Sequence, residues 1–281
     1  MTDRPLLNAR ANKSLGQHFL FDPDILDRTA LASGPVDGSV VIEVGPGPGG
    51  LTAALLRKGA KAVVALEMDA RFAAALREWP ETREGRLHVI EGDALAINIP
   101  DLLEELGLEG PVRIIANLPY NVGTPLVVDW LKAGDWRGQM ALMFQHEVAI
   151  RLCAQPGDKH YGRLAVLTHA VCSAHIAFTL PPGAFRPPPK VDSSVAVLLP
   201  LPADEKFADL EAIEKVAAAA FGQRRKMLRA SLKSIAGAMG TDATAWLEGC
   251  EIDPTRRAET LSQNEFRALA RSWRQQVSKL A

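Results

Sequence analysis

A stretch near the start of the chain reads Val40-Val41-Ile42-Glu43-Val44-Gly45-Pro46-Gly47-Pro48-Gly49-Gly50. Its first five residues predict a buried strand, and residues 51–57 (LTAALLR) have the period of a helix. Glycine residues at a strand-to-helix turn let the backbone approach a ligand closely, because no Cβ stands in the way. The stretch therefore predicts the first strand, the ligand-binding turn and the first helix of an α/β sheet domain.

Short apolar runs and segments of helical period alternate from this turn as far as Leu199. We expect further strands at residues 62–67, 87–90, 112–116, 140–144, 175–179 and 194–199. We expect further helices at residues 71–79, 124–133, 147–154 and 164–171. Apolar strands that alternate with helices indicate a mainly parallel sheet covered on both faces. The last strands have less helix between them, which favours an antiparallel edge there.

The pattern changes after Pro200-Leu201-Pro202, beyond which we expect no strand. Residues 210–221, 224–235 and 265–277 have helical period. We therefore predict a sheet domain at residues 1–202 and a small all-helical domain at residues 203–281. Residues 1–21 precede the first strand and are predicted to form an arm that packs onto the sheet domain or caps its ligand.

The composition is that of an ordinary globular protein of 281 residues, which excludes collagen-like, disordered and disulfide-stapled chains. No apolar run reaches the roughly 18 residues that a membrane span needs. Residues 1–12 lack the apolar segment of a signal peptide. Three cysteines without a C-x-x-C pair suit a reducing cytosol, so we expect a cytoplasmic protein.

The net charge of -1 conceals an uneven distribution along the chain. Residues 1–21 carry a net +2, residues 22–110 a net -8, and residues 111–281 a net +5. Such asymmetry is a weak indication of a polyanionic partner. Chance variation on a solvated surface explains it equally well.

The spacing of the glycine turn indicates which nucleotide it binds. Dinucleotide-binding turns have the pattern G-x-G-x-x-G, whereas this turn has G-x-G-x-G and two prolines, Pro46 and Pro48, that remove N–H groups. A loop with few donors suits a pyrophosphate poorly. The turn therefore favours S-adenosylmethionine, which has an amino-acid end and no phosphate, over NAD.

Two acidic residues stand at the ends of the next two strands. Glu67 lies 22 residues after Gly45, where an acid can accept hydrogen bonds from both ribose hydroxyls. Asp93 ends the third strand, where it could accept a hydrogen bond from an adenine amino group. Either acid alone is better explained as a surface residue or a helix N-cap, but the three strand ends together favour a nucleoside pocket.

The fourth strand ends in Asn117-Leu118-Pro119-Tyr120, at the sheet edge where a second substrate should lie. An exocyclic amine is a poor nucleophile until its geometry changes, because its lone pair is delocalised into the base. The Asn117 side-chain oxygen and the Leu118 carbonyl can accept its two hydrogens and favour the positive charge that develops on nitrogen. Tyr120 offers a ring on which a planar base can stack. Without the glycine turn upstream, we would interpret this segment as a simple strand-ending turn.

A proline-rich segment, Phe185-Arg186-Pro187-Pro188-Pro189-Lys190-Val191, follows the strand around Ile176. Such a rigid segment can hold Phe185 against the opposite face of a flipped base, with Arg186 and Lys190 near phosphate. The alternatives are a plain connection between strands and a PxxP ligand for a partner domain. The second alternative is disfavoured because the segment lies inside the sheet domain.

The tail contains a basic run without an acid, namely Arg224, Arg225, Lys226, Arg229 and Lys233. Positions 225, 229 and 233 share one face of the predicted helix, which makes them a candidate phosphate track, with an ordinary solvated face as the alternative. A separate pattern, His169-x2-Cys172-x2-His175, resembles a metal site but lacks a fourth ligand. We interpret those three residues as packing residues and expect no metal.

Several segments resemble the ribosomal RNA adenine dimethyltransferases over nearly the whole chain. They are KSLGQHFL (13–20), EVGPGPGGLT (43–52), LEMD (66–69), GDAL (92–95), NLPYNVGTPL (117–126), FQHEVAIRL (144–152), FRPPPKVDSSV (185–195) and FGQRRKMLR (221–229). The resemblance implies a Rossmann-like class I S-adenosylmethionine-dependent methyltransferase domain followed by a helical RNA-binding domain. It also implies four methyl transfers to N6 of two adjacent adenosines near the 3′ end of small-subunit (16S) rRNA, with S-adenosylhomocysteine as product.

The resemblance also implies site residues. Contacts with the cofactor are expected from His18, Leu20, Gly45, Gly47, Glu67, Met68, Asp93, Ala94 and Asn117. The catalytic set is expected to be Asn117, Leu118, Pro119, Tyr120 and Phe185. The family often has Asn where this chain has His18, and we expect the contact to survive because imidazole also donates one hydrogen bond.

We therefore predict a monomeric methyltransferase that docks the rRNA of an assembling small (30S) subunit through its tail. It extrudes an adenine and stacks it between Tyr120 and Phe185. One alternative is a large-subunit rRNA adenine dimethyltransferase of the antibiotic-resistance type, against which the helical tail and residues 185–195 argue. The other is a non-catalytic RNA-binding assembly factor with the same fold, against which Asn117, Tyr120 and Glu67 argue.

Overall fold

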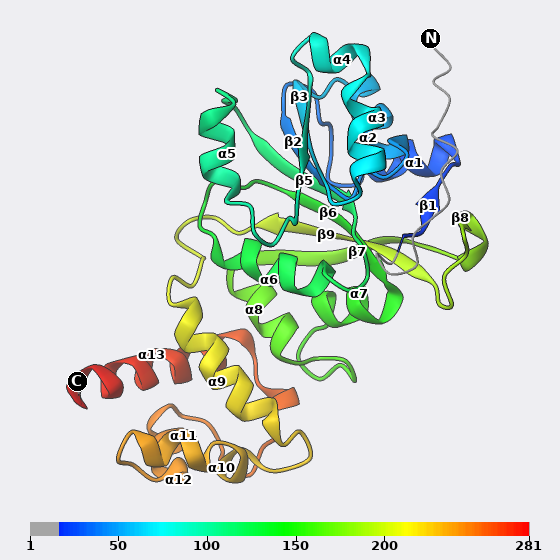
Figure 1. Cartoon of the computed structure of the whole chain (residues 1–281). Helices are drawn as coiled ribbons and strands as arrows, with labels where there is room; N and C mark the ends of the chain where they lie inside the picture. The colour runs from blue at the N-terminus through cyan, green and yellow to red at the C-terminus, as the bar shows by residue number, and fades with distance from the viewer. Residues whose placement is uncertain (1–16, 281) are drawn as a thin grey trace. The chain divides into compact units, whose positions relative to one another are not determined.

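The computed structural model of the chain describes residues 17–280 and divides into two compact units (Figure 1). The sheet unit holds the described residues up to Ala149 together with His175–Leu199. The helical unit holds Ile150–Ala174 together with the residues from Pro200 onward. The division after Leu199 is close to the predicted boundary at residue 202, whereas residues 150–174, which the sequence assigns to the sheet domain, belong to the helical unit.

The strands of the described chain confirm the predicted positions and add two short ones. They are β1 (Phe19–Leu20), β2 (Val40–Val44), β3 (Ala62–Glu67), β4 (Leu87–Glu91), β5 (Val112–Asn117), β6 (Met140–Gln145), β7 (Cys172–Leu180), β8 (Phe185–Arg186) and β9 (Ser193–Pro200). One sheet has the order β4-β3-β2-β5-β6-β9-β7, and β1 pairs with β8 in a separate antiparallel pair. β9 runs antiparallel to β6, which confirms the predicted antiparallel edge.

The helices of the sheet unit and of residues 150–174 lie between these strands. They are α1 (Pro23–Ala30), α2 (Gly50–Arg57), α3 (Ala70–Arg77), α4 (Pro80–Arg83), α5 (Ile99–Glu105), α6 (Gly123–Lys132), α7 (His146–Cys153) and α8 (Arg163–Val171). The tail forms α9 (Leu210–Gly222), α10 (Leu228–Ser231), α11 (Lys233–Ala238), α12 (Ala243–Gly249) and α13 (Gln263–Leu280). Short 3₁₀ turns occur at Pro182–Ala184 and Ala258–Thr260. Among residues 17–280, no helix is both long and apolar enough to cross a membrane.

Besides the four-residue α4, three short helices are not predicted by the periodicity of the sequence: α1, α5 and α12. Each begins at a residue whose side chain accepts hydrogen bonds from backbone N–H groups of the first turn, namely Asp22, Asn98 and Asp242. Such N-caps stabilise a helix by about 1 kcal/mol because they satisfy donors that have no partner within the helix. These capping residues are the sequence signal that locates the three helices.

The order of the strands places a crevice at the end of β2. β2 pairs in parallel with β3 on one side and with β5 on the other, so the chain winds away from β2 in both directions. Loops at the carboxyl ends of the two neighbouring strands therefore leave in opposite directions. In open α/β sheets a ligand binds at such a switch point.

Both faces of the central strands are buried. Alternate side chains of β2, β3 and β5 form one core cluster with the helices α1 and α2, and this cluster includes Val41, Val63 and Ile115. The intervening side chains, among them Ile42 and Ile114, are fully buried as well. Figure 1 shows α5 on the other side of these strands from α1, α2 and α3. Burial of one such side chain stabilises the fold by about 1.5–3 kcal/mol, so the helices on both faces hold the strands in place.

The turn after β2 depends on glycine at two positions in particular. Gly47 and Gly49 have φ values of +52° and +87°. A Cβ at Gly47 would lie 2.7 Å from the Phe19 ring, and one at Gly49 would lie 2.5 Å from the Trp79 ring. Both positions therefore require glycine for the backbone conformation and for space.

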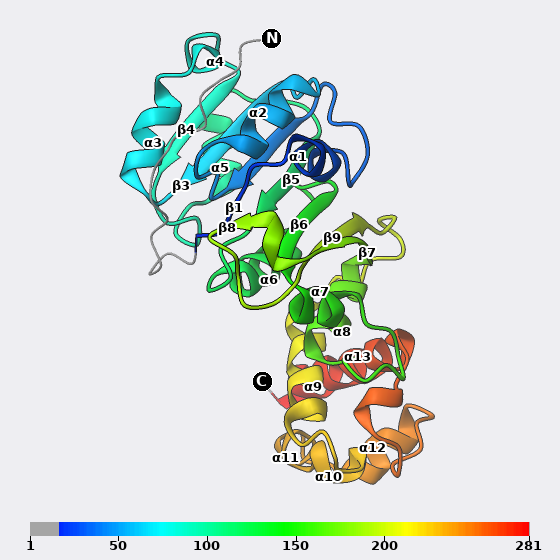
Figure 2. The ribbon, with the colours of Figure 1, turned by 90° about the vertical axis from the view of Figure 1, so that its right-hand side faces the viewer.

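The helical unit has its own core. The rings of Tyr161 and Phe266 both pack against Phe221, with centroids 5.9 and 5.8 Å away. Figures 1 and 2 show α9 and α13 side by side, and Arg274 of α13 pairs with Asp209 at the start of α9 at 2.6 Å. These contacts join the segments of the tail into one body.

The predicted helix at residues 224–235 is wrong. Residues 223–227 form a turn, and two short helices, α10 and α11, follow it. The backbone N–H groups of Leu228 and Arg229 donate to the carbonyls of Arg256 and Pro254, at 2.8 and 3.1 Å. The chain bends here because these bonds and the burial of Leu228 replace the contacts of a continuous helix.

Candidate functional site

A pocket in the sheet unit lies at the carboxyl ends of β2, β3, β4 and β5. Its lining includes the residues assigned to the cofactor from sequence, namely His18, Leu20, Gly45, Gly47, Glu67, Met68, Asp93, Ala94 and Asn117. These residues come from five separate segments of the chain. The structure thus brings the whole predicted cofactor set together at the switch point.

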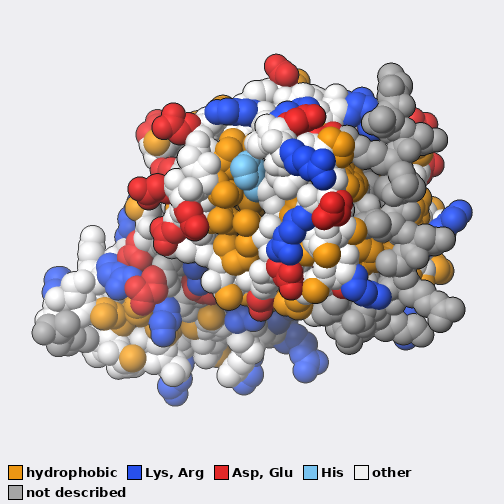
Figure 3. Space-filling model, turned by 45° about the horizontal axis from the view of Figure 1, so that its top comes forward, with side chains coloured by type: hydrophobic (Ala, Val, Ile, Leu, Met, Phe, Trp, Pro, Cys, Tyr) orange, Lys and Arg blue, Asp and Glu red, His pale blue; other side chains and the backbone are white. Residues whose placement is uncertain are grey.

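The charge of the pocket is acidic. Glu43, Glu67 and Asp93 are among the described residues that line it, and no Lys or Arg is. Elsewhere both signs of charge are present on the surface, as Figure 3 shows for one face, where hydrophobic side chains lie between acidic and basic ones. The pocket therefore disfavours a phosphate group and favours a ligand with positive charge.

Glu67 links the glycine turn to the end of β3. One carboxylate oxygen accepts a hydrogen bond from the Gly47 N–H at 2.9 Å, and the other accepts one from the Asp69 N–H at 2.8 Å. Burial raises the pKa of Glu67, although both backbone donors oppose that shift. A carboxylate oxygen can accept more than one hydrogen bond, so Glu67 retains capacity for a ligand hydroxyl.

Glu43 is a second buried carboxyl in the pocket wall. Its side chain is 1% exposed and accepts a hydrogen bond from the Thr52 hydroxyl at 2.6 Å. Burial raises the pKa of Glu43 to about 8, and the neighbouring charge of Glu67 adds to the shift. The carboxyl is therefore largely protonated at neutral pH unless a cation lies against it.

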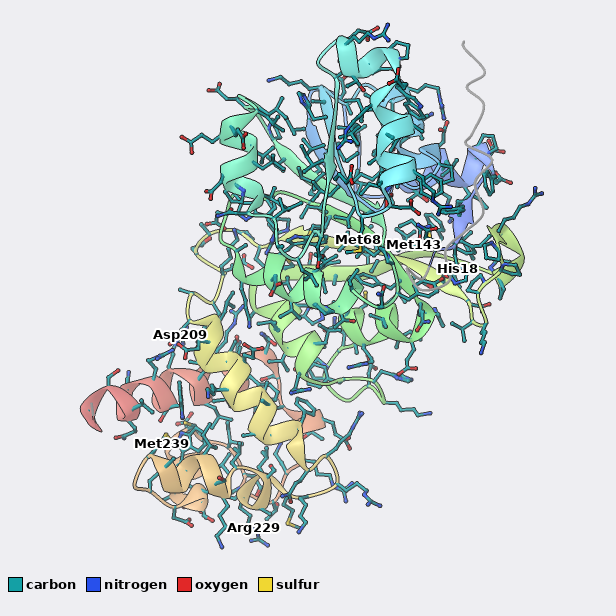
Figure 4. The ribbon with its side chains drawn as sticks, in the orientation of Figure 1. His18, Met68, Met143, Asp209, Arg229 and Met239 are labelled. Atoms are coloured by element: carbon teal, nitrogen blue, oxygen red, sulfur yellow. The ribbon has the colours of Figure 1, made fainter. Side chains whose placement is uncertain are left out.

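The segment Gln17–Leu20 crosses the pocket. Gln17 donates to the Asp69 carboxylate at 3.2 Å, and β1 pairs with β8 through Phe19 and Arg186. The hydrogen bonds of Arg71 lower the pKa of Asp69 to about 2, so Asp69 is charged when it accepts from Gln17. Figure 4 shows His18 beside β1 and β8. The predicted arm thus contacts the sheet unit within residues 17–20, while residues 1–16 lie outside the described part of the chain.

The segment after β5 presents Asn117 to the pocket. The Asn117 side-chain Nδ2 donates to the His18 carbonyl at 3.0 Å. This bond leaves the side-chain oxygen as the acceptor for another group. The carbonyl of Pro119 accepts from the N–H groups of Val122 and Gly123, at 3.2 and 3.1 Å, and so begins α6. Leu118 and Pro119 line the pocket as well.

Tyr120 is held by contacts at both ends of its side chain. Its hydroxyl shares a hydrogen bond of 2.6 Å with the hydroxyl of Ser193, which is fully buried. Its ring stacks on the His18 imidazole with a centroid distance of 5.3 Å and an interplanar angle of 29°. Burial raises the pKa of Tyr120, so the phenol stays neutral over the physiological range.

Phe185, which is predicted from the sequence to lie against a flipped base, is not among the residues that line the pocket. Its side chain is 2% exposed and belongs to the core cluster of the sheet unit. Side chains of β8 alternate, so Phe185 points into the core and Arg186 is exposed. In this structure Phe185 therefore packs in the core, and the ring that stacks on Tyr120 is that of His18.

The predicted RNA contacts are exposed in both units. In the sheet unit, Arg186 lies over the Phe21 ring at 5.9 Å and Lys190 is exposed. In the helical unit, the exposed side chains are those of Arg224, Arg225, Lys226, Arg229 and Lys233. Arg224 pairs with Glu259 at 3.4 Å. The predicted single helical face is wrong because the chain bends within this segment, but the exposure of its basic residues agrees with the prediction.

Several pocket residues were given no site role from the sequence, and three of them, Gln17, Phe19 and Glu43, make contacts described above or lie in the glycine-turn strand. Gln17 and Phe19 flank His18 within the segment KSLGQHFL, so their position beside a predicted contact is the available signal. Glu43 is the one acid in a strand whose five residues are all buried. Burial of a carboxyl group in such a strand lowers the stability of the fold unless the group has a partner. The presence of Glu43 there is therefore a sequence signal of a functional role.

Among the described residues, no group of three or more His, Cys, Asp or Glu side chains could hold a metal ion. His169 contacts the Ala154 carbonyl at 3.2 Å through its Nε2 atom. Burial lowers the pKa of His169, which keeps its ring neutral. These contacts agree with a packing role for His169.

We predict that Glu43→Gln flattens the pH dependence of stability of the ligand-free protein. The folded pKa of about 8 lies above the unfolded value of about 4.5, so the folded state binds more protons between them. Stability is therefore lost as pH rises from about 5 to 8, by at most about 1.4 kcal/mol per pH unit. Denaturant unfolding at pH 5, 6.5 and 8 measures this slope.

The exposed Glu104→Gln serves as the matched control for that variant and should keep the wild-type slope. An equal slope in Glu43→Gln and the wild-type protein would show that Glu43 is not the group responsible.

Comparisons with known proteins agree with this geometry. The ribosomal RNA adenine dimethylase family matches the chain over residues 8–274. A "Ribosomal RNA small subunit methyltransferase A" of Maricaulis maris is 50% identical over 265 residues, which are 94% of this chain and 91% of the relative. A protein of the same name from Agrobacterium fabrum is 53% identical over 264 residues, or 92% of each chain.

Two solved structures share the fold. A dimethyladenosine transferase from Plasmodium falciparum has a TM-score of 0.77 at 26% identity and covers 92% of this chain and 98% of its own. The 23S rRNA methyltransferase ErmE has a TM-score of 0.65 at 24% identity, covers 91% of this chain and 99% of its own, and shows the fold alone. With a pocket at the switch point and a family match along nearly its full length, this chain belongs to the ribosomal RNA adenine dimethylase family.

Proposed function

We propose that this chain is an S-adenosylmethionine-dependent enzyme that dimethylates N6 of two adjacent adenosines near the 3′ end of small-subunit (16S) rRNA. The observation that carries the proposal is the position of Asn117, whose free side-chain oxygen lies in the wall of an acidic pocket. The relatives at 50% and 53% identity bear small-subunit names, which favours the small subunit over the large one.

The pocket suits S-adenosylmethionine for reasons of shape and charge. Gly45 and Gly47 let the turn pass close to Pro119 and Phe19 in the pocket wall, and Pro46 and Pro48 remove donors that a pyrophosphate would need. Glu67 would accept from the ribose hydroxyls and Asp93 from the adenine amine. Bound there, S-adenosylmethionine supplies an electrophilic methyl group on a positively charged sulfur. The acidic lining favours that charge.

The acceptor amine would bind beside Asn117. The Asn117 oxygen and the Leu118 carbonyl accept its two hydrogens, which directs the nitrogen lone pair toward the methyl group. Because the amide Nδ2 is already bonded to the His18 carbonyl, the oxygen is held in the accepting orientation. Tyr120 stacks on the base. The methylated nitrogen is acidic enough to lose its proton to water, so the chain needs no strong base.

The exposed basic residues are proposed to bind rRNA phosphates. Arg225, Lys226 and Lys233 make no ion pair with any described residue, so their charges are available. We propose that the enzyme acts as a monomer on an assembling small subunit, since one chain supplies the pocket lining. The three free cysteines agree with a reducing cytoplasm.

The direct test uses the full chain, labelled S-adenosylmethionine and small subunits that lack the modification. We expect label in N6,N6-dimethyladenosine at two adjacent positions near the 3′ end of 16S rRNA. Nuclease digestion and mass mapping identify the labelled nucleosides. Label in large-subunit RNA would support the alternative substrate, and no label in either subunit would contradict the enzyme.

We predict that Asn117→Ala lowers the single-turnover rate of methyl transfer by about 100-fold at saturating cofactor, because one preorganised acceptor is lost. Cofactor affinity, measured by calorimetry, should change much less. Asn117→Asp should also be slow because its carboxylate cannot donate to the His18 carbonyl. Asn264→Ala, at an exposed position of α13, is the control. An unchanged rate in Asn117→Ala would exclude the orienting role.

We predict that Arg225→Ala with Lys226→Ala weakens binding to small subunits and makes it less sensitive to salt. Each lost phosphate contact lowers the slope of log affinity against log salt by about 0.7–0.9. Filter binding between 50 and 200 mM salt, typical of such measurements, gives the slope. Lys215→Ala with Lys279→Ala removes the same charge from other exposed positions and should keep the slope. Equal slopes in the two double variants would show that Arg225 and Lys226 do not contact phosphate groups directly.

A further inference from the structure

His18 contacts the three parts of the acceptor side of the pocket. Its backbone carbonyl accepts the hydrogen bond of the Asn117 amide at 3.0 Å. Its ring stacks on Tyr120 with centroids 5.3 Å apart. Its Nδ1 atom lies 2.8 Å from the carbonyl oxygen of Pro187. One residue therefore connects the acceptor amide, the stacking ring and the proline-rich segment.

The contact with Pro187 determines which ring nitrogen carries a hydrogen. A carbonyl oxygen only accepts hydrogen bonds, so the His18 Nδ1 atom must donate. That bond fixes the rotation of the imidazole about its side-chain torsions. The imidazole is thus held against the Tyr120 ring, whose hydroxyl is itself fixed by the hydrogen bond with Ser193.

The spacing of the two rings leaves no room for a base between them. A base stacked between two rings needs them about 6.8 Å apart, twice the 3.4 Å spacing of stacked bases. The observed 5.3 Å means that His18 occupies one face of Tyr120. A planar base can therefore stack only on the other face. Because Phe185 lies in the core, it supplies no second wall.

We propose that His18 is a positioning residue for the methyl acceptor: it backs the Tyr120 ring, so that the target adenine stacks on the single remaining face, next to the Asn117 oxygen. This inference rests on the proposed function and deepens it. The backbone carbonyl of His18 fixes the orientation of the Asn117 amide, and the side chain of His18 fixes the position of the Tyr120 ring. Side-chain variants therefore test the second role without removing the first.

Three variants separate the two contacts of the imidazole. His18→Phe keeps a ring for Tyr120 but cannot donate to Pro187. His18→Asn keeps an N–H at the same bond distance from Cα as Nδ1 but has no ring. His18→Ala removes both. His88→Ala is the control, since His88 also contacts a backbone carbonyl, that of Gly85 at 3.0 Å, but does not line the pocket.

The activity measurement is single-turnover methyl transfer to under-methylated small subunits at saturating S-adenosylmethionine, as a function of subunit concentration. Loss of the ring stack and loss of the hydrogen bond should each lower the efficiency of methyl transfer a few-fold. His18→Ala loses both contacts, so its transfer efficiency should fall by on the order of 10-fold. His18→Phe and His18→Asn should each recover part of the loss. His88→Ala should match the wild-type protein.

A second measurement does not depend on activity. The chain has two tyrosines, Tyr120 and Tyr161, so ring-labelled tyrosine gives two sets of NMR signals. His18→Ala should move the Tyr120 signals and leave those of Tyr161, which lies in the core of the helical unit, unchanged. His18→Phe should keep the Tyr120 signals displaced by a neighbouring ring.

The outcomes distinguish this inference from the proposed function. If the wild-type protein transfers methyl groups and His18→Ala does so equally well, the positioning role is wrong. If His18→Ala binds subunits more tightly, the imidazole occupies the place of the base and the proposed arrangement is overturned. A loss that appears only below saturating cofactor would make His18 a cofactor contact instead. If the wild-type protein transfers nothing, the proposed function fails, and unchanged Tyr120 signals in His18→Ala would separately refute the stack.

Discussion

The hydrogen bonds of the Glu67 carboxylate hold the pocket together. Through one oxygen it fixes the Gly47 N–H of the turn after β2, and through the other it fixes the Asp69 N–H of the turn after β3. In the first turn Pro46 and Pro48 have no N–H to donate, so the Gly47 N–H is the donor between them. One buried side chain therefore sets the distance between two walls of the pocket. Burial of its charge is tolerated because two backbone donors face it.

Acidic side chains are concentrated in the lining of the pocket. The acidic side chains of Glu43, Glu67 and Asp93 are gathered where four strands end, and the unpaired basic side chains are exposed elsewhere. The net charge of -1 therefore does not reveal that the pocket is lined by acidic residues without a Lys or Arg among the described residues. An acidic pocket of this kind favours a cationic ligand, and the total charge of the chain does not indicate it.

Much of the fold could be predicted from local patterns. The central strands follow from apolar β-branched runs, since strands buried on both faces need apolar residues throughout. The short helices that were missed are specified by caps such as Asp22 and Asn98, which periodicity does not detect. The helix expected at residues 224–235 fails because Leu228 and Arg229 bond to a segment 25 or more residues away. The hydrophobic pattern of a short segment contains no information about a hydrogen-bond partner so distant in the chain.

By itself, the sequence determined the strands of the large sheet, the glycine turn and the strand-end residues that meet at one edge of the sheet. These are local properties, because parallel strands bring their carboxyl ends to one edge whatever the rest of the chain does. Only the tertiary structure decided what surrounds Tyr120. The alternation of β8 buries Phe185, and the pairing of β1 with β8 places His18 against Tyr120, roughly a hundred residues away in sequence. The direction in which a side chain points depends on which strand pairs with its own, and that pairing is settled by the folded chain as a whole.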